Sequence, residues 1–394
     1  MKILVIHNYW QQRGGEDEAV EAEIRLLESY GHKVIFYKRG NCEINGCGFF
    51  KKLKVLVKDM IWSNKTYRDI KEISDKEKPD IAHIHNIFIL ISPSVYYALR
   101  EKKIPIVQTL HNYRFFCPSG IFYREGKVCE KCCKGNFIPA IIHKCWRSSY
   151  VLSYFFSRCL KSHFKNNTFK KNIDAYIALS EFSRKKFIEM GLPAGKIFIK
   201  PNFLDSGMQE QSDKQDFFLF AGRLADYKGI DTLIEAFKLS GLPLKVIGDG
   251  PKHKDVQKKI EGAGNIELLG RLPFREVLDY IRRARCVVFT SECYENMPRV
   301  IIESFACGVP VVASDFGATK ELVSDRVNGL LFEASNSKSL ARKTGFLAKN
   351  LELCEKFGIG ARAAYEQKFT PDINYKILMD IYRTAGANEE VTAD

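Results

Sequence analysis

The sequence predicts an α/β protein of two doubly wound domains, each with its own parallel sheet and flanking helices. The chain has 394 residues and is 45% hydrophobic, which is enough for two separate cores. Short apolar runs typical of buried strands alternate with segments of helical periodicity, and this alternation restarts in the second half. We place the junction near 200–203, between a domain at 1–200 and another at 201–370.

In the first domain, the predicted strands are 3–6, 33–37, 80–85 and 104–110. The first strand leads through a loop containing Gly14 and Gly15 into a helix over 16–30. Glycines between a strand and a helix can present backbone N–H groups to a phosphate. The pattern is not G-x-G-x-x-G and no acidic ribose ligand follows the second strand, so a dinucleotide site is not predicted.

In the second domain, the predicted strands are 217–222, 244–248, 266–269, 286–290 and 309–313. Pro298 suits a first helical position, so we expect a helix from about 297 that ends at Gly308. Glu295 then lies in the loop before this helix, and Glu303 lies within it. Ligands of such units bind at the carboxyl ends of the strands, beside helix N-termini.

Two cations follow the strand 217–222, namely Arg223 and Lys228. Arginine can bind phosphate oxygens through two N–H groups, and lysine can neutralise charge that develops on a leaving diphosphate. Gly248 and Gly250 follow the next strand and would let the backbone approach a ligand, although a plain turn explains them equally well.

These residues resemble family 4 of the glycosyltransferases, which are retaining enzymes of the GT-B fold. The resemblance depends on the Glu-x7-Glu spacing of Glu295 and Glu303, the segment Ala-Cys-Gly-Val-Pro-Val-Val at 306–312, and Asn-Gly-Leu-Leu-Phe at 328–332. It covers nearly the whole chain. It implies two Rossmann-like domains facing a cleft, an acceptor site in the first domain, a nucleotide-sugar site in the second, and a final helix at 371–394 that returns to the first.

The resemblance also implies roles for individual residues. Arg223 and Lys228 would bind the diphosphate, Glu295 the hydroxyls of the donor sugar, and Glu303 the ribose, while His111 would face the donor sugar. Together with the strand-end glycines, the predicted donor site comprises Gly14, Gly15, His111, Gly222, Arg223, Lys228, Gly248, Gly250, Arg271, Leu272, Glu295, Asn296, Met297, Pro298 and Glu303. Of these, His111, Arg223, Lys228 and Glu295 are the predicted catalytic residues.

Four cysteines at Cys117, Cys129, Cys132 and Cys145 form a C-x11-C-x2-C-x12-C pattern, with Cys133 and His143 nearby. Four soft ligands with one x2 spacing are typical of a tetrahedral structural zinc, which could brace an insertion at 115–147. The alternative is a set of buried free thiols. His83 and His85, which alternate along a predicted strand, are weaker candidates for a functional site.

The net charge of +14 is unevenly distributed. Residues 1–200 hold 35 Lys and Arg against 19 Asp and Glu, giving +16, whereas the remainder holds 26 against 28, giving −2. The basic half is either a solvated surface or a site for an anionic membrane, a polyprenyl-diphosphate acceptor or nucleic acid. The segments 49–62 and 150–171 mix aromatic and basic residues, as an interfacial helix or a core-facing helix with a basic outer face would.

No stretch approaches the roughly 20 apolar residues of a membrane span, and the first apolar run is short for a signal peptide. We therefore expect a cytoplasmic protein, peripheral at the inner face of the plasma membrane, with no cofactor for its chemistry. The predicted function is a retaining, metal-independent transfer from a nucleoside-diphosphate sugar, UDP favoured over GDP, to a glycan or polyprenyl-diphosphate-linked acceptor in bacterial surface polysaccharide synthesis. The predicted partners do not include nucleic acid. Two alternatives remain open: a sugar-nucleotide epimerase or phosphorylase of the same fold, and a zinc-containing nucleic-acid-binding protein.

Overall fold

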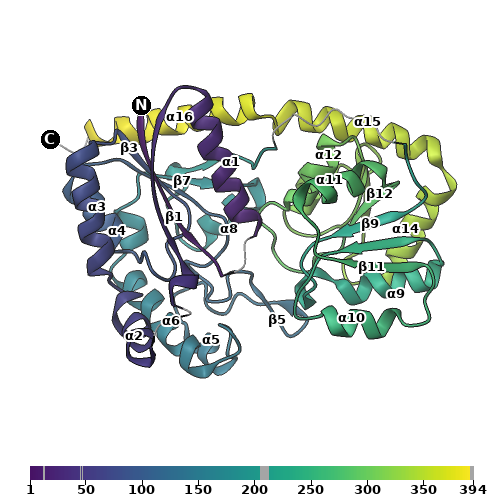
Figure 1. Ribbon diagram of the computed structural model, residues 1–394, viewed down its shortest axis with the longest axis horizontal. Coiled ribbons are helices and arrows are strands. Elements are labelled where there is room, and N and C mark those ends of the chain that lie inside the picture. The colour runs from purple at the N-terminus through teal and green to yellow at the C-terminus, as the bar shows by residue number, and fades with distance from the viewer. Residues whose placement is uncertain (12–13, 45, 47, 205–212, 391–394) are drawn as a thin grey trace. The chain divides into compact units, whose positions relative to one another are not determined.

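The computed structural model describes residues 1–11, 14–44, 46, 48–204 and 213–390. The chain forms two compact units (Figure 1). The first consists of Met1–Phe122, Cys129–Lys200 and Asn374–Asp394, and the second of Tyr123–Val128 and Pro201–Ile373. The chain therefore leaves the first unit after Lys200 and returns to it at Asn374.

The first unit is built on a six-stranded sheet with the order β2-β1-β3-β4-β7-β8, in which all neighbouring strands are parallel. Its strands are β1 (Lys2–Tyr9), β2 (Lys33–Gly40), β3 (Ile81–Ile84), β4 (Ile106–Thr109), β7 (Ala175–Ala178) and β8 (Ile197–Ile199). Every residue of β3, β4 and β7 is buried, as expected for the central strands of a parallel sheet covered on both faces.

The helices of the first unit connect and cover these strands. They are α1 (Gly15–Ser29), η1 (Asn41–Ile44), α2 (Phe49–Lys54), η2 (Val55–Asp59), α3 (Asn64–Glu77), α4 (Ser94–Glu101), α5 (Ile138–Ile142), α6 (Tyr150–Lys165), α7 (Thr168–Lys171), α8 (Glu181–Glu189), η3 (Ala194–Lys196) and α16 (Pro371–Glu390). Helix α1 starts where Gly14 in extended conformation donates its N–H to Asp17 Oδ2 at 3.0 Å, which satisfies one free group at the helix start.

The second unit repeats the architecture with the parallel order β11-β10-β9-β12-β13-β14. Its strands are β9 (Phe218–Ala221), β10 (Leu244–Ile247), β11 (Ile266–Gly270), β12 (Cys286–Phe289), β13 (Val311–Ser314) and β14 (Gly329–Phe332), with a hairpin of β5 (Tyr123–Arg124) and β6 (Lys127–Val128). Its helices are η4 (Asp226–Lys228), α9 (Ile230–Ser240), α10 (His253–Ile260), α11 (Phe274–Arg283), α12 (Arg299–Ala306), α13 (Thr319–Leu322), α14 (Ser337–Lys349) and α15 (Leu351–Lys368).

Alternation along β9 divides the core of the second unit into two layers. Phe217 and Leu219 pack with α11 and α12 on one face, whereas Phe218 and Phe220 pack with α9 on the other. Successive side chains of a strand point to opposite faces, so a continuous apolar run serves both layers. Figure 1 shows α11 and α12 on one side of this sheet and α9 and α10 on the other.

The predicted fold class is confirmed, because both units contain a parallel six-stranded sheet with flanking helices. Three differences concern detail. The strands β7, β8 and β14 were not predicted, and α12 starts at Arg299 with Pro298 as its N-cap rather than near 297. The insertion 115–147 does not belong wholly to the first domain, since Tyr123–Val128 lies in the second unit. Within the described residues, no helix is both long and apolar enough to span a bilayer.

Candidate active site

The topology of the second unit brings two loops to one place. The strands β9 and β12 are hydrogen-bonded neighbours, but the chain proceeds outward from β9 to β10 and β11 before it crosses to β12. At such a switch point the loops after the two strands diverge and leave a crevice for a ligand. The segment 222–229 follows β9 and the segment 290–298 follows β12. The sequence places its main candidate residues in these two loops.

Lys228 and Glu295 meet across this switch point. Lys228 Nζ lies 2.5 Å from Glu295 Oε1, and both side chains are 18% exposed. The same carboxylate oxygen accepts a hydrogen bond from Ser291 Oγ at 2.7 Å. A charge-assisted pair with a further hydroxyl donor holds Glu295 in one orientation. Two of the predicted catalytic residues are therefore in contact.

The pair perturbs both ionisation equilibria in favour of the charged forms. Burial opposes ionisation of Glu295, but the ammonium of Lys228 and the hydroxyl of Ser291 hold the pKa of this carboxyl below its usual value. Burial likewise opposes the charge on Lys228, and Glu295 outweighs it, raising the pKa of the lysine. Both groups stay charged at neutral pH.

The two loops approach so closely that one position requires glycine. Gly229 has φ of +62°, and a Cβ atom there would lie 2.0 Å from the carbonyl oxygen of Thr290. Thr290 Oγ1 also donates to the Lys228 carbonyl at 2.7 Å, and Ser291 Oγ lies 3.1 Å from the Tyr227 carbonyl oxygen. These bonds fix the backbone on either side of the Lys228–Glu295 pair.

The predicted glycines of the neighbouring loops have a structural explanation. Gly248 has φ of +140°, and a Cβ there would lie 1.8 Å from the carbonyl oxygen of Gly222. At Gly250 a Cβ would lie 2.3 Å from the Leu224 carbonyl. Backbone-to-backbone packing therefore accounts for Gly248 and Gly250 without a ligand.

Two arginines extend from the same sheet edge. Arg223, after β9, and Arg271, after β11, are exposed, and neither forms an ion pair with another described residue. Leu272 beside Arg271 packs partly against the core formed by α11 and α12. Arg223 therefore has no protein carboxylate to compete with a bound anion in the described part of the chain.

Helix α12 carries Glu303 to a buried position, where 7% of the residue is exposed. Arg299 Nε lies 3.5 Å from Glu303 Oε1, one helical turn away. In the sequence, Asn296, Met297 and Pro298 separate Glu295 from this helix. Asn296 and Pro298 are buried, and Met297 packs partly against the core. The Arg299 contact was not predicted, although the i, i+4 spacing of opposite charges indicates it.

A second carboxylate of the β12 loop was also missed. Glu292 Oε1 accepts from Thr232 Oγ1 at 3.1 Å, and its Oε2 accepts from Tyr123 Oη at 3.2 Å. The contact explains why the β5–β6 hairpin belongs to the second unit. No local pattern in the sequence indicates a contact between residues 169 positions apart.

The remaining candidates, Gly14, Gly15 and His111, belong to the first unit. Gly14 and Gly15 are exposed at the start of α1, and a Cβ on Gly14 would meet nothing within 4 Å. Asp17 in the first turn of α1 accepts from Gly14 N and lies 2.8 Å from the buried His7 Nε2. The strand β1 and the helix that follows it are thus held together at the glycine loop.

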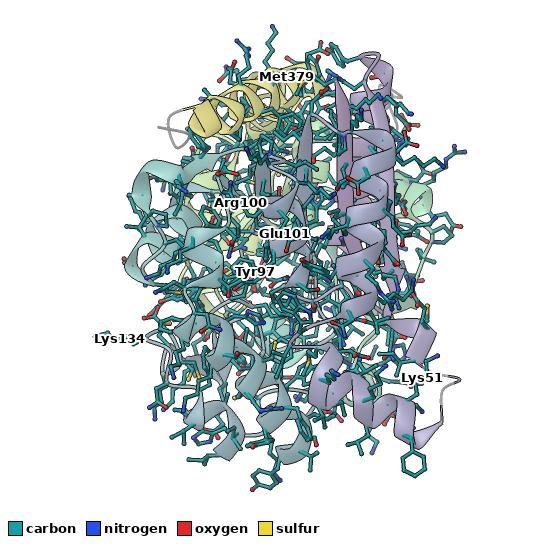
Figure 2. All side chains as sticks on the ribbon, turned by 90° about the vertical axis from the view of Figure 1, so that its left-hand side faces the viewer. Lys51, Tyr97, Arg100, Glu101, Lys134 and Met379 are labelled. Atoms are coloured by element: carbon teal, nitrogen blue, oxygen red, sulfur yellow. The ribbon has the colours of Figure 1, made fainter. Side chains whose placement is uncertain are left out.

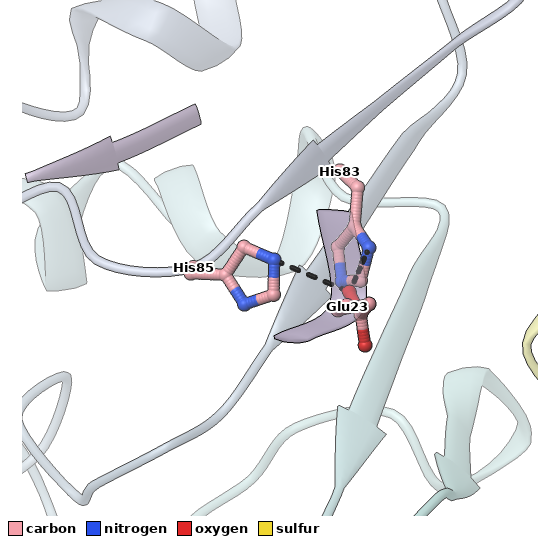
Figure 3. Close-up of side chains that lie close together, drawn as sticks. All are labelled: Glu23, His83 and His85. Carbon is pink, nitrogen blue, oxygen red and sulfur yellow. Dashed lines mark ion pairs between the residues drawn. The ribbon is translucent and has the colours of Figure 1, made fainter. Parts of the chain in front are cut away.

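His111 follows β4 and contacts a buried cluster on the neighbouring strand. His111 Nε2 lies 2.9 Å from Nδ1 of His85, and the His85 ring lies beside Glu23 of α1 (Figure 3). His83 Nδ1 lies 3.0 Å from Glu23 Oε1, and Glu23 Oε2 accepts from Lys200 Nζ at 2.6 Å. His83 and His85, the weaker candidates, therefore belong to one network with His111.

The zinc prediction is not supported. A tetrahedral site with Zn–S bonds of about 2.3 Å needs sulfur atoms roughly 4 Å apart. Within the described residues, the only group with three ligand atoms inside 4.8 Å of one another is Glu23, His83 and His85. The sulfurs of Cys117, Cys129, Cys132 and Cys145 are not gathered in this way, and Cys133 and His143 do not complete such a group.

The cysteines instead behave as ordinary thiols. Cys117 Sγ lies 3.1 Å from Ser119 Oγ, and burial, aided by Cys117 and Cys145, raises the pKa of Cys132 to about 12. The alternative of free thiols describes this segment better, with Cys117 and Cys132 buried and Cys129 and Cys145 half-buried.

Comparison with known proteins agrees with this geometry. A model of "Glycosyltransferase Family 4" matches residues 20–207, and one of "Glycosyl transferases group 1" matches residues 205–364. An uncharacterized glycosyltransferase of Methanocaldococcus jannaschii is 32% identical over 380 residues, covering 94% of each chain. The chain belongs to glycosyltransferase family 4. The sequence-based assignment of the family is therefore confirmed.

Further similarities extend over the fold of this glycosyltransferase. TuaC of Bacillus subtilis, a putative teichuronic acid biosynthesis glycosyltransferase, is 29% identical and covers 67% of this chain and 60% of its own. HepE of Anabaena, solved in complex with UDP, superposes with a TM-score of 0.69 over 97% of this chain and 99% of its own, at 19% identity. The GT-B fold of the family 4 enzyme is thus confirmed.

Proposed function

We propose that this family 4 enzyme is a retaining transferase that moves a sugar from a UDP-sugar to a glycan or lipid-linked saccharide in surface polysaccharide synthesis. The observation that carries the proposal is the Lys228–Glu295 pair at the β9–β12 switch point. The UDP complex of HepE, which has the same fold, supports the choice of nucleotide. The names of several relatives, including TuaC and the E. coli O-antigen chain mannosyltransferase C, support the polysaccharide.

The diphosphate of the donor binds to Arg223 and Lys228. Arg223 is exposed at the carboxyl end of β9 and can present its guanidinium to two phosphate oxygens. Lys228 is held protonated by Glu295 and neutralises the charge that grows as the sugar departs. These two cations do what a divalent metal does in other transferases, so the chemistry needs no added metal.

The carboxylates orient the sugar and the nucleoside. Lys228 and Ser291 both contact Oε1 of Glu295. The other carboxylate oxygen, Oε2, can accept a hydrogen bond from a sugar hydroxyl. Glu303, oriented by Arg299, binds the ribose. In the first unit, Gly14 and Gly15 lie at the exposed start of α1, where the Gly14 N–H is donated to Asp17, and we assign His111 to the donor sugar.

Retention follows when the acceptor attacks from the face that the diphosphate leaves. The acceptor hydroxyl bonds to the anomeric carbon as the bond to the phosphate oxygen breaks, and the leaving phosphate takes the hydroxyl proton. Arg223 and Lys228 stabilise the departing charge in this step. Glu295 stays ionised beside Lys228 and positions the sugar rather than bonding to it.

One end of the first unit is suited to a membrane-bound acceptor. Residues 49–58 hold 4 lysines and residues 131–165 hold 7 Lys and Arg, while neither segment has Asp or Glu. All these cations are exposed; Figure 2 labels two of them, Lys51 and Lys134. At roughly 1 kcal/mol per cation near an anionic bilayer, a few of them suffice for reversible binding.

Large apolar side chains accompany these cations. Eight exposed apolar residues lie on α2, η2, α5 and α6: Phe50, Leu53, Val57, Ile138, Ile142, Tyr150, Val151 and Tyr154. The elements are joined, since Arg158 of α6 donates to the Val57 carbonyl at 2.9 Å and α5 packs against α6. Figure 1 shows α2, α5 and α6 together at one end of the first unit. We therefore place the peripheral membrane contact on this face.

The donor proposal is tested by thermal shift with UDP, GDP and their sugars. A ligand that binds only the folded protein stabilises it by RT ln(1 + [L]/Kd), so the correct nucleotide raises Tm and the incorrect one does not. We expect UDP to stabilise the wild type and to lose most of this effect in Arg223→Ala. Stabilisation by GDP alone would overturn the nucleotide, and unchanged UDP binding in Arg223→Ala would overturn the site.

A further inference from the structure

One buried carboxylate links His111 to both points where the chain passes between the units. Glu23, on α1, is 4% exposed, and its Oε2 accepts from Lys200 Nζ at 2.6 Å. Lys200 also donates to Asn374 Oδ1 at 3.1 Å. Lys200 is the last residue before the chain enters the second unit, and Asn374 is the first residue on its return. Glu23 and Lys200 therefore fix both points inside the first unit.

The other oxygen of Glu23 faces His83 of β3 and His85, which directly follows this strand. Oε1 lies 3.0 Å from His83 Nδ1 and 3.4 Å from His85 Nε2 (Figure 3). His83 is held on its other side by Thr109 Oγ1, which lies 2.7 Å from its Nε2. On the far side of its ring, His85 Nδ1 lies 2.9 Å from His111 Nε2. The contacts thus run from Lys200 through Glu23 and His85 to His111.

The charges in this network decide where its protons lie. Burial would raise the pKa of Glu23, but Lys200 and His83 hold it well below its usual value, so the carboxylate is ionised. Burial, together with the neighbouring His83, lowers the pKa of His85 to about 3, and that of His111 is also held well below its usual value. Each of these two imidazoles is neutral and carries one N–H.

The position of each proton follows from the partner that each nitrogen faces. His85 Nε2 lies 3.4 Å from the anionic Glu23 Oε1, outside hydrogen-bond geometry, and the negative charge of this oxygen favours a proton on Nε2 over a lone pair. His85 Nδ1 is then an acceptor, and the contact at 2.9 Å makes His111 Nε2 the donor. His111 Nδ1 is left with a lone pair.

We propose that Glu23, acting through His85, is a positioning residue that fixes His111 as its Nε2–H tautomer and leaves Nδ1 as a hydrogen-bond acceptor for the donor sugar. The ligand, though not the tautomer, rests on the proposed function. An acceptor nitrogen binds a hydroxyl group and repels a carboxylate oxygen, so His111 selects a neutral, hydroxylated sugar over a uronic acid at that position.

A metal ion is the competing occupant of this cluster, since its three ligand atoms lie within 4.8 Å of one another. The ammonium of Lys200 already neutralises Glu23 from 2.6 Å. A divalent ion on the opposite oxygen would place a second cation beside it in a buried site. The geometry therefore favours a proton over a metal.

The test is long-range ¹H–¹⁵N NMR on protein labelled at its 8 histidines, which reports the tautomer of each ring. In the wild type we expect His85 and His111 as Nε2–H. In Glu23→Gln, the amide oxygen accepts from Lys200 and the NH₂ group faces the histidines. His85 and His111 should then both switch to Nδ1–H.

A second variant guards against misfolding, because Glu23→Gln leaves Lys200 buried without its carboxylate. Glu23→Met/Lys200→Met removes both charges, and His111 should then populate both tautomers. The kcat/KM of this double variant for the donor should fall by roughly threefold to tenfold, because one neutral hydrogen bond to the sugar is lost in part of the molecules. His163→Gln, a buried histidine of α6 outside the network, should change neither reading.

Three results would overturn the proposal: Nδ1–H on His111 in the wild type, an unchanged tautomer in both variants, or stoichiometric zinc whose removal shifts the His83 and His85 resonances. Absence of donor turnover in the wild type would overturn the proposed function instead. The NMR readings do not depend on turnover, so the two failures are distinguishable.

Discussion

Replacing Lys228 by methionine tests whether the switch-point cation acts on the donor or only on Glu295. Methionine keeps much of the aliphatic stem and removes the ammonium that lies 2.5 Å from the carboxylate. A charge-assisted bond to a phosphate is worth about 1.5–3 kcal/mol. Since about 1.4 kcal/mol corresponds to a factor of ten in rate, kcat/KM for the UDP-sugar should fall about ten- to a hundredfold.

Lys228→Met should also lower the free energy of unfolding, because it leaves the largely buried carboxylate of Glu295 without its cation. Each side chain of the pair is 18% exposed, so Glu295 loses its cation in a largely dry site and keeps the neutral donors Ser291 Oγ and Cys293 Sγ. The cost of such an unpaired group is about 1–3 kcal/mol. Lys228→Met/Glu295→Gln removes the orphaned charge, so stability should recover while donor turnover stays low.

The assay combines steady-state kinetics with chemical denaturation, with Lys259→Ala as a control. Lys259 lies 2.5 Å from Asp231, but both side chains are about half exposed, so its loss should change neither reading appreciably. Wild-type turnover in Lys228→Met would refute the role of the cation. Full recovery of turnover in the double variant would show that the lysine serves only to pair Glu295.

The pair also predicts a pH window. The folded-state pKa of Glu295 is depressed, so its contribution is present above the usual value of 4.5 and is lost as pH falls through the lower folded value. The pKa of Lys228 is raised, so its contribution is complete below 10.5 and is lost only as pH rises through the higher folded value. The stability difference between the wild type and Glu295→Gln should be constant from pH 6 to 9 and shrink in acid.

Three further predictions concern other parts of the molecule. Transferase activity should survive EDTA, and it should fall about tenfold or more in Arg223→Ala. An absolute need for Mg²⁺ or Mn²⁺ would contradict a diphosphate bound by side chains alone. Gly229→Ala should destabilise the protein by about 2–5 kcal/mol, because φ is +62° and a carbonyl oxygen lies 2.0 Å from the new Cβ. Gly241→Ala is the control: its φ is +68° but no atom lies near the new Cβ, so it should cost only about 1–2 kcal/mol. Equal losses of stability in the two variants would contradict the close packing at Gly229. The protein should float with anionic liposomes at low salt and less so at high salt. Phe50→Ser should weaken flotation, whereas Ile359→Ser, at another highly exposed apolar site, in the second unit, should not; no flotation at low salt would favour a soluble acceptor.

The local pattern of the sequence was enough for the fold class and for the strand ends that carry charge. Buried parallel strands such as β9 and β12 are continuous apolar runs, and their ends are marked by glycine and charged residues. The strand β7, Ala175–Ala178, was missed because its four residues, Ala-Tyr-Ile-Ala, are too few to give a distinctive period. The four cysteines show the opposite error, since their spacing indicates a zinc site that the folded chain does not form.

Partners distant in the chain were decided only by the tertiary structure. Lys228 and Glu295 are 67 residues apart, and they meet because β9 and β12 are neighbours in a sheet whose order differs from chain order. Glu23 and Lys200 are 177 residues apart and belong to a helix and the end of an edge strand. Sequence periodicity records which face of an element is buried, but the partner of a polar side chain depends on strand order and on the register between strands. The residue types at the site were therefore readable from the sequence, whereas the pairing that sets their charge and their protons was fixed by the packing of the fold.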